Sequence, residues 1–453
     1  MRSGAVSAQE IVTESLDRIS HVDTSGYELK SVIALSHDPD SRSVVDPHLP
    51  LAGIPILIKD NVECIGLPGS AGSLALSDYP VARDSAIVSR LRVAGAQIIG
   101  ATNLSEWANI RSTKSTSGWS GLGGLTANPW IHERSAGGSS SGSGAAIAAG
   151  LVSLAVGTET DGSIICPASL NGCVGIKPTV GSVPREGVIP ISASQDSPGS
   201  MARTVEDAAL LLEIMMGASG LVEATSENRT MKIGVVKSWI TGHGGTDALL
   251  ESATNLLAKS GISIVDIDLT PPDEETGNDE LAVMLHELFD DLGSHLRNRC
   301  GEKLATLHDV MRFNQEHSAT ELQFFGQELF EQAFALGGRS GEYSDKRARN
   351  VSWATSTLEK GFENVDVLIG ATYSPAWKST LGQGDDYAHS SWITMAPAIA
   401  GTPIGCLPMG ITEGLPVGLG VVSRRSDEVG LVRAMAHIER VLGLGILEPT
   451  FIK

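Results

Sequence analysis

The fold follows mainly from the stretch Ser135-Ala-Gly-Gly-Ser-Ser-Ser-Gly-Ser-Gly144, which continues as Ala145-Ala-Ile-Ala-Ala-Gly150 and then as Gly157-Thr-Glu-Thr-Asp-Gly-Ser163. A tract of glycine and serine is by itself typical of a flexible linker. Here the tract leads into small apolar residues without a polar face, and a helix of that kind is buried. We therefore expect an ordered loop, in which glycine permits close backbone approach and the amides before the helix favour negative charge.

Two polar features lie at the ends of apolar runs. The turn from Gly157 to Ser163 has consecutive backbone N–H groups that can form a nest for an oxyanion. Lys59 ends the apolar run of residues 51–58. Its ordinary interpretation is a solvated charge at the end of a strand. If Lys59 is buried instead, its pKa falls, and a neutral lysine is a competent base.

The neighbouring segments alternate between strand and helix patterns. Residues 51–58 and 95–100 are short apolar runs typical of buried strands, and Ser85 to Ala94 between them predicts a helix. Ala145 to Ala155 predicts a helix of small residues, followed by a turn over Gly157 to Gly162. This alternation predicts an α/β fold, a single large α/β/α domain around a twisted mixed sheet.

The amino-acid composition changes near residue 217, where charged helical patterns with little glycine begin. Strand patterns return near residue 365, so we expect a helical segment inserted between two halves of one domain. The predicted boundaries are one domain over 1–453, with a core of 5–217 and 365–445 and a variable helical segment at about 218–364.

The composition excludes several classes of protein. With 53 acidic and 33 basic residues, the net charge of −20 does not suit binding to phosphate backbones or to anionic lipid. We therefore expect no nucleic-acid partner and no membrane partner. No uninterrupted run of roughly 18 apolar residues is present, so no membrane span is predicted.

Cysteine and histidine usage points to a reducing compartment and to chemistry without a metal. The five cysteines are odd in number and widely spaced, which does not indicate a disulfide framework. The eleven histidines are scattered without a ligand motif, and neither a dinucleotide fingerprint nor a P-loop is found. We expect no metal and no cofactor. Because no signal peptide is visible, we predict a cytoplasmic protein, with a truncated start left open because Met1 opens almost directly on a helix.

Gly138-Ser-Ser-Ser-Gly142 matches the G-x-S-x-G nucleophile elbow and would make Ser140 a nucleophile. An elbow requires a strand immediately before the turn, whereas residues 128–137 form a polar loop. This context argues against a histidine-driven serine hydrolase.

Four segments together resemble the amidase signature family. They are Ile58-Lys-Asp-Asn61, Gly137 to Gly150, Gly157 to Ile164 and Gly175-Ile-Lys-Pro-Thr179. The C-terminal segments Gly401-Thr-Pro-Ile-Gly405 and Gly414-Leu-Pro-Val-Gly418 are similar to the last strands of that family. The resemblance covers residues 5 to 217 and 365 to 445.

The resemblance implies a Ser-Ser-Lys triad that cleaves a carboxamide C–N bond through an acyl-enzyme. By motif position Ser163 is the nucleophile, Ser139 the bridging serine after a cis peptide bond with Gly138, and Lys59 the base. The backbone amides of Thr160, Asp161, Gly162 and Ser163 correspond to the oxyanion hole.

Two departures narrow the resemblance. The family usually has a small residue before Gly162, where this chain has Asp161. It commonly has an arginine two positions after the nucleophile, where this chain has Ile165. These two residues, together with the segments 102–109, 117–120 and 190–199, make the chain look like bacterial peptide amidases. Those enzymes hydrolyse the C-terminal amide of peptides. The alternatives are a glutaminase subunit of a tRNA-dependent amidotransferase, a non-catalytic binding protein on the same scaffold, and an aryl, aliphatic, hydrazide or urea-type hydrolase.

The substrate contacts and the assembly state are further expectations. We expect a small-molecule or peptide amide as the partner, and a monomer or a homodimer as the assembly. The residues expected to contact substrate are Gly118, Trp119, Ser140, Tyr373 and Trp377.

Overall fold

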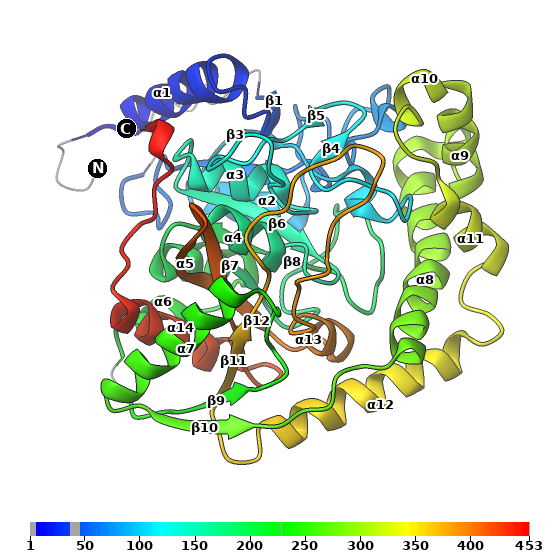
Figure 1. Ribbon diagram of the computed structural model, residues 1–453. Helices are drawn as coiled ribbons and strands as arrows, with labels where there is room; N and C mark the ends of the chain where they lie inside the picture. The colour runs from blue at the N-terminus through cyan, green and yellow to red at the C-terminus, as the bar shows by residue number, and fades with distance from the viewer. Residues whose placement is uncertain (1–5, 37–45, 228, 453) are drawn as a thin grey trace.

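An eleven-stranded mixed sheet forms the middle of the molecule, with helices on both of its faces (Figure 1). The computed structural model describes residues 6–36, 46–227 and 229–452, so the predicted start of the chain, residues 1–5, lies outside the described residues. The strands of this sheet are β1 (Val32–Leu35), β2 (Pro55–Lys59), β3 (Gln97–Thr102), β6 (Leu154–Glu159), β7 (Val174–Lys177), β8 (Ser197–Ala202), β9 (Lys232–Val236), β10 (Ser263–Ile267), β11 (Val367–Ala371), β12 (Ile404–Thr412) and β13 (Leu415–Val422).

The helices connect these strands and cover the sheet. A separate two-stranded ribbon consists of β4 (Trp119–Ser120) and β5 (Gly124–Leu125). The helices are α1 (Ala8–Arg18), α2 (Ala86–Val93), α3 (Ser141–Ala148), α4 (Ile165–Asn171), α5 (Val205–Met216), α6 (Leu221–Ser226), α7 (Gly244–Lys259), α8 (Glu274–Cys300), α9 (Leu307–Glu316), α10 (Ser318–Glu321), α11 (Glu328–Leu336), α12 (Tyr343–Gly361), α13 (Met395–Ala400) and α14 (Glu428–Leu442).

The strand order places the two halves of the chain side by side in one sheet. The order is β1-β3-β2-β6-β8-β7-β12-β13-β11-β9-β10. β2 is parallel to both β3 and β6, whereas the strands from β6 through β8, β7, β12 and β13 to β11 pair antiparallel. The predicted α/β fold with a mixed sheet is confirmed by this topology.

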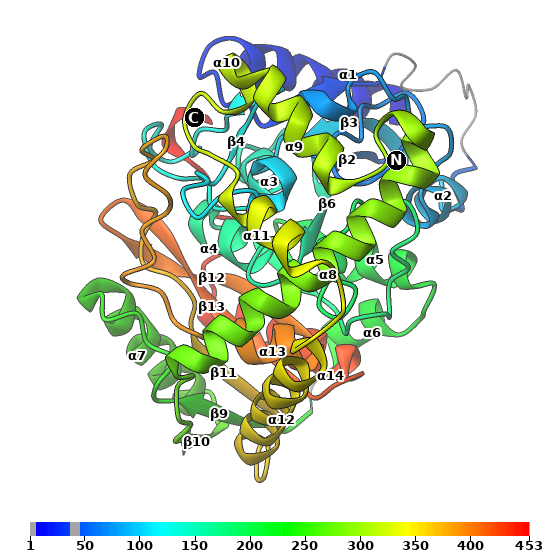
Figure 2. The ribbon, with the colours of Figure 1, turned by 90° about the vertical axis from the view of Figure 1, so that its right-hand side faces the viewer.

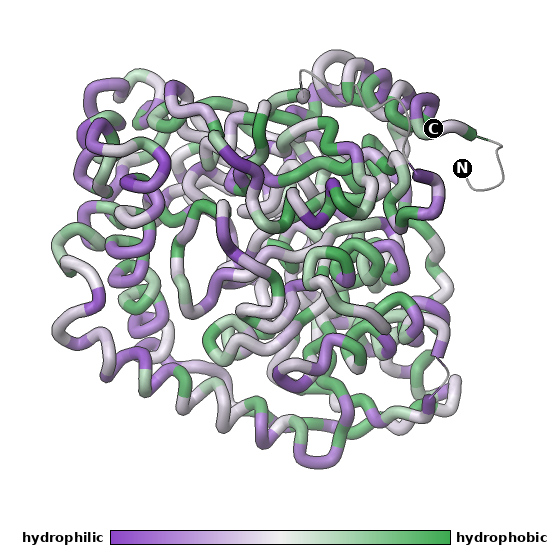
Figure 3. Tube along the Cα trace, turned by 180° about the vertical axis from the view of Figure 1, so that it is seen from behind, coloured by the Kyte–Doolittle hydropathy of each residue, from purple (hydrophilic) through white to green (hydrophobic). Residues whose placement is uncertain are grey.

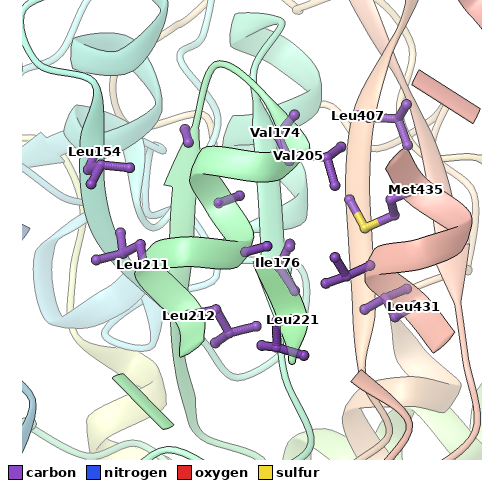
Figure 4. Close-up of a cluster of buried hydrophobic side chains, with 14 of the residues drawn as sticks. Leu154, Val174, Ile176, Val205, Leu211, Leu212, Leu221, Leu407, Leu431 and Met435 are labelled. Atoms are coloured by element: carbon purple, nitrogen blue, oxygen red, sulfur yellow. The ribbon is translucent and has the colours of Figure 1, made fainter. Parts of the chain in front are cut away.

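Each face of the sheet carries its own hydrophobic core, because side chains alternate along a strand. In β2, Ile56 and Ile58 belong to one core, whereas Leu57 belongs to the other. Figure 4 shows part of the first core, where α5 and α14 pack Leu211 and Met435 toward the strands β7 and β12. The opposite core contains the buried helix α3, in which every residue is buried.

One predicted helix is shorter than expected. The pattern over Ala145 to Ala155 is compatible with a helix, but α3 ends at Ala148 and Leu154–Glu159 forms the central strand β6. Gly150 adopts a left-handed conformation with φ +65°, which ends the helix. A short run of small apolar residues suits a buried helix and a buried strand equally well, so the pattern alone cannot separate them.

The segment between the two halves is largely helical, but it also adds two strands, β9 and β10, to the edge of the sheet. Its helices α8, α9 and α11 pack around a third core that includes Leu285, Leu288 and Leu292. Figure 2 shows α8 crossing this side of the molecule diagonally. α12 runs along the lower edge and alternates hydrophilic and hydrophobic residues (Figure 3), as expected for a helix with one buried stripe.

Within the described ranges, no helix combines the length and the apolar character that crossing a membrane requires. In the same part of the chain, no cluster of three or more His, Cys, Asp and Glu side chains is arranged to hold a metal ion.

Candidate active site

Lys59 is completely buried at the end of β2 and points at a serine hydroxyl. Its Nζ donates to Ser139 Oγ at 2.7 Å, to Thr158 Oγ1 at 2.9 Å and to the Thr158 carbonyl at 3.2 Å. Burial lowers the pKa of Lys59 to about 7, although the carboxylates of Glu159 and Asp196 act in the opposite direction. A lysine in this environment holds a substantial neutral fraction near neutral pH and can accept a proton.

The loop before α3 holds Ser139 against Lys59. The peptide bond between Gly138 and Ser139 is cis, as the family resemblance implies. Ser105 N donates to the Ser139 carbonyl at 3.1 Å, and this hydrogen bond holds the backbone of Ser139 in place. A side chain at Gly138 would collide with the hydroxyls of Ser105 and Ser117, so glycine is required here for close approach.

Ser163 lies in the turn between β6 and α4, beside the same loop. Ser140 N donates to the Ser163 carbonyl at 3.0 Å, which joins the two segments. Glu159 Oε2 accepts from the backbone amides of Ile164 at 2.6 Å and Ile165 at 3.0 Å, and this carboxylate closes the turn. Gly162 has φ +75°, and a Cβ there would lie 2.5 Å from Tyr373 Oη. The turn can therefore adopt this shape only with glycine before the serine.

A cavity of about 390 Å³ opens in front of this turn. Its volume is in the range that accommodates small ligands. The inserted segment reaches it through one residue, Met284, on α8. The lining residues are Ala108, Asn109, Ile110, Gly138, Thr160, Asp161, Gly162, Ser163, Cys166, Ile191, Met284, Tyr373, Tyr387, Ser390, Ser391, Trp392, Thr394 and Met395.

Asp161 is the one carboxylic acid among the described residues that line this cavity, and no lysine, arginine or histidine accompanies it there. Burial raises the pKa of Asp161 to about 6, and the hydroxyl of Thr394 partly offsets that effect. Within the described part of the chain, its Oδ1 has no hydrogen-bond partner. The cavity wall next to Ser163 is therefore anionic above about pH 6.

The structure brings most of the predicted residues together. Lys59 and Ser139 are hydrogen bonded, and the turn from Thr160 to Ser163 lines the cavity together with Tyr373.

The other four predicted substrate contacts are not among the described residues that line the cavity, and each has partners elsewhere. Gly118 N donates to Ser105 Oγ at 3.0 Å, and Trp119 is buried edge-on against Phe325. Ser140 Oγ is occupied by the backbone of Thr158, accepting from its N–H and donating to its carbonyl. Trp377 Nε1 donates to Asp385 Oδ1 at 3.2 Å. Substrate contact by these four residues stays a prediction.

Several wall residues are not among the predicted substrate contacts. Asn109 reaches the cavity because Trp107, Ala108 and Asn109 are all left-handed, with φ of 50°, 53° and 78°. Tyr387 comes from the loop between β11 and α13, drawn orange in Figure 1, which rises to the level of β4 and returns. Only the packing of distant segments brings these side chains to one cavity.

Comparisons with known proteins agree with this geometry. A family model described as Amidase matches residues 10–432. One subunit of the glutamyl-tRNA(Gln) amidotransferase of Methanococcoides burtonii is 32% identical, and the match covers 96% of this chain and 94% of that protein.

Solved structures of peptide amidases share the whole fold. The peptide amidase in complex with the competitive inhibitor chymostatin has a TM-score of 0.90 and 37% identity over 99% of this chain and 97% of its own. The native peptide amidase from Stenotrophomonas maltophilia has a TM-score of 0.88 and 36% identity over 99% and 96% of the two chains. The chain therefore belongs to the amidase signature family of amide hydrolases.

Proposed function

We propose that this amide hydrolase removes the C-terminal amide of peptides or amino-acid amides through an acyl-enzyme on Ser163. Ser139 relays the proton and Lys59 is the base. The observation that carries the proposal is the 2.7 Å hydrogen bond between Ser139 Oγ and a completely buried Lys59, beside a turn that carries Ser163 into the cavity.

In the acylation step, the proton of Ser163 Oγ passes to Ser139 Oγ while Ser139 passes its own proton to neutral Lys59. Ser163 Oγ then bonds to the amide carbon. The relay runs backward to protonate the nitrogen, the C–N bond breaks, and ammonia leaves. Water repeats the sequence on the ester and releases the carboxylic acid, so the relay returns to its starting state.

The tetrahedral oxygen requires donors in the turn. The backbone N–H groups of Thr160 to Ser163 supply them in this proposal, and the turn is already fixed by Glu159 before substrate arrives. Preorganised donors of this kind each contribute about 3 kcal/mol to lowering the barrier.

The substrate class is argued from the cavity wall and from the relatives. Free glutamine carries an α-carboxylate, whose burial without a cation is costly. The described lining residues include no lysine, arginine or histidine, which favours an amidated peptide or amino acid over glutamine. The peptide amidase structures in the comparison support the same choice.

A glutaminase subunit remains the second candidate, because the relatives matched over almost the whole chain include subunits of glutamyl-tRNA(Gln) amidotransferases. That candidate requires partner subunits, whereas the peptide-amide proposal requires a monomer or homodimer that acts alone in the cytoplasm without nucleic acid.

The test is ammonia release by the purified chain from N-acetyl-leucine amide, an aryl amide and glutamine. We expect release from the peptide-like amide, and loss of both release and labelling by a fluorophosphonate in Ser163→Ala. A matched Ser169→Ala variant, in the following helix α4, controls for changes to the helix. Release from glutamine alone, or labelling that persists in Ser163→Ala, would contradict the proposal.

A further inference from the structure

Asp161 occupies an unusual place, since a carboxylate next to an oxyanion site opposes the charge that develops during the reaction. The residue lines the cavity two positions before Ser163, and one of its side-chain oxygens has no hydrogen-bond partner among the described residues. A carboxylate that lines a cavity without a counter-charge is unfavourable. A cationic group of the substrate would supply that counter-charge.

In the proposed reaction the leaving group is ammonia, so every other part of the substrate belongs to its acyl half. The leaving nitrogen must lie by Ser139 to receive its proton, since Ser139 is the residue hydrogen bonded to Lys59. Asp161 therefore borders the acyl half of the substrate.

A second carboxyl group lies behind this wall. Glu280 of α8 is 6% exposed and accepts from Gln195 Nε2 at 2.9 Å, and Met284, one turn further along the same helix, lines the cavity. Burial and the charge of Asp161 together raise the pKa of Glu280 well above its usual range. The acyl side of the cavity is thus bordered by two mutually repelling carboxyl groups, and a cation bound there would relieve their repulsion.

Among the described residues, no lysine, arginine or histidine lines the cavity. Lys177 Nζ donates to the carbonyls of Pro178 and Thr402, at 3.1 Å and 2.7 Å, and Arg347 of α12 donates to the Ile399 carbonyl at 3.1 Å. Both side chains influence the two carboxyl groups only from outside the described lining.

We infer that the wall around Asp161 is a subsite for a positively charged group on the acyl side of the scissile amide. Two substrate features carry that chemistry, namely the α-ammonium of an amino-acid amide and the side chain of a C-terminal lysine or arginine. The inference rests on the proposed function, and it adds a charge preference that the family resemblance does not supply.

The experiment is a cycle of two enzymes and two pairs of substrates, measured as kcat/KM at pH 7 and low ionic strength. Leucine amide against N-acetyl-leucine amide tests the α-ammonium. N-acetyl-lysine amide against N-acetyl-norleucine amide tests the side chain. We expect the wild type to favour the charged member of one pair, and Asp161→Asn to reduce that ratio at least tenfold. The pair that responds identifies the source of the charge.

Two controls separate this preference from a structural effect. In Glu280→Gln, which keeps the size of the side chain and the carboxylate of Asp161, the preference should shrink less than in Asp161→Asn, because Asp161 lines the cavity and Glu280 lies behind its wall. In the wild type, the preference should shrink between pH 7 and pH 5, because Asp161 takes up a proton near pH 6. The titratable or polar groups around it are Glu159, Glu280, Lys177, Tyr373 and Thr394. This second readout does not depend on the folding of a variant.

The outcomes are distinguishable. Equal effects of Asp161→Asn on both members of each pair, or a wild-type preference for the neutral members, would overturn the subsite and leave the proposed function standing. If the wild type releases ammonia from none of these amides, both proposals fall.

Discussion

Two lysines of this molecule are buried to the same degree and differ in what they touch. Lys59 ends β2 and Lys177 ends β7, and both are 0% exposed. Burial lowers the pKa of the first to about 7 and of the second to about 8. Lys59 donates to the hydroxyl of Ser139, beside the cavity, whereas Lys177 donates to two backbone carbonyls.

The difference shows that burial alone does not make a base. A carbonyl oxygen has no proton to give, so Lys177 can only hold two chain segments together and offset the charges of Glu159, Asp161 and Glu428. A hydroxyl is both donor and acceptor, so Lys59 can exchange a proton with Ser139.

The most severe test of this contrast is to replace each lysine by methionine. We expect Lys59→Met to lower kcat about 10²- to 10⁴-fold, which is the usual loss on removal of a general base. Lys177→Met should instead leave kcat nearly unchanged and act on the free energy of unfolding, by about 1 to 3 kcal/mol, because the carbonyls of Pro178 and Thr402 lose their donor. Turnover of the two purified variants and urea unfolding measure these effects. Similar rate losses in both would remove the distinction.

The adjacent residues Ser139 and Ser140 differ in the same way, since one contacts the base and the other contacts only backbone. Ser139 Oγ contacts Lys59, whereas Ser140 Oγ bonds only to the backbone of Thr158. We expect Ser139→Ala to lower kcat about 10²-fold or more. Ser140→Ala should act mainly on stability, by about 1 kcal/mol. Steady-state kinetics of both variants decide between them, and an equal rate loss in Ser140→Ala would revive the nucleophile-elbow interpretation.

The pH dependence of activity should follow the titration of Lys59 and not that of Lys177. Because the base must be neutral, activity should rise as pH increases through about 7, falling roughly tenfold per pH unit below that value. Because Lys177 takes no part in proton transfer, the conservative variant Lys177→Arg should show the same midpoint of the rise in activity with pH. A profile of kcat/KM on a neutral amide checks this, and a limb that moves with Lys177 rather than with Lys59 would contradict it.

The last prediction concerns the pH dependence of stability. The pKa of Lys59 is lowered from 10.5 to about 7 on folding. The unfolded chain therefore binds more protons between these values, and the cost of burying the lysine is largest below pH 7 and disappears above about pH 10.5. We expect Lys59→Met to have a higher free energy of unfolding in urea than the wild type below pH 7, with the advantage shrinking toward pH 10. An advantage independent of pH would show that packing, not charge, is responsible.

Much of the fold can be anticipated from local pattern. Only a narrow set of backbone conformations suits the composition of three segments: the end of the strand at Lys59, the glycine- and serine-rich loop, and the turn before Ser163. Gly138 and Gly162 show this, because a side chain at either position would collide with its neighbours. β6 escapes prediction because small apolar residues suit a buried helix and a buried strand alike. The edge strands β9 and β10 escape it because several of their side chains are only partly buried or exposed.

The family, the presence of a mixed sheet and the short segments that meet around Lys59 follow from the sequence alone, because turn geometry and buried periodicity are local properties. The cavity wall does not. Asn109, Met284, Tyr387 and Thr394 come from four separate segments, and tertiary packing brings them together. The same packing makes Lys59 meet a hydroxyl and Lys177 meet carbonyls. A lysine at the end of a strand looks the same in either case, since its pKa and its partner depend on what other segments place around it.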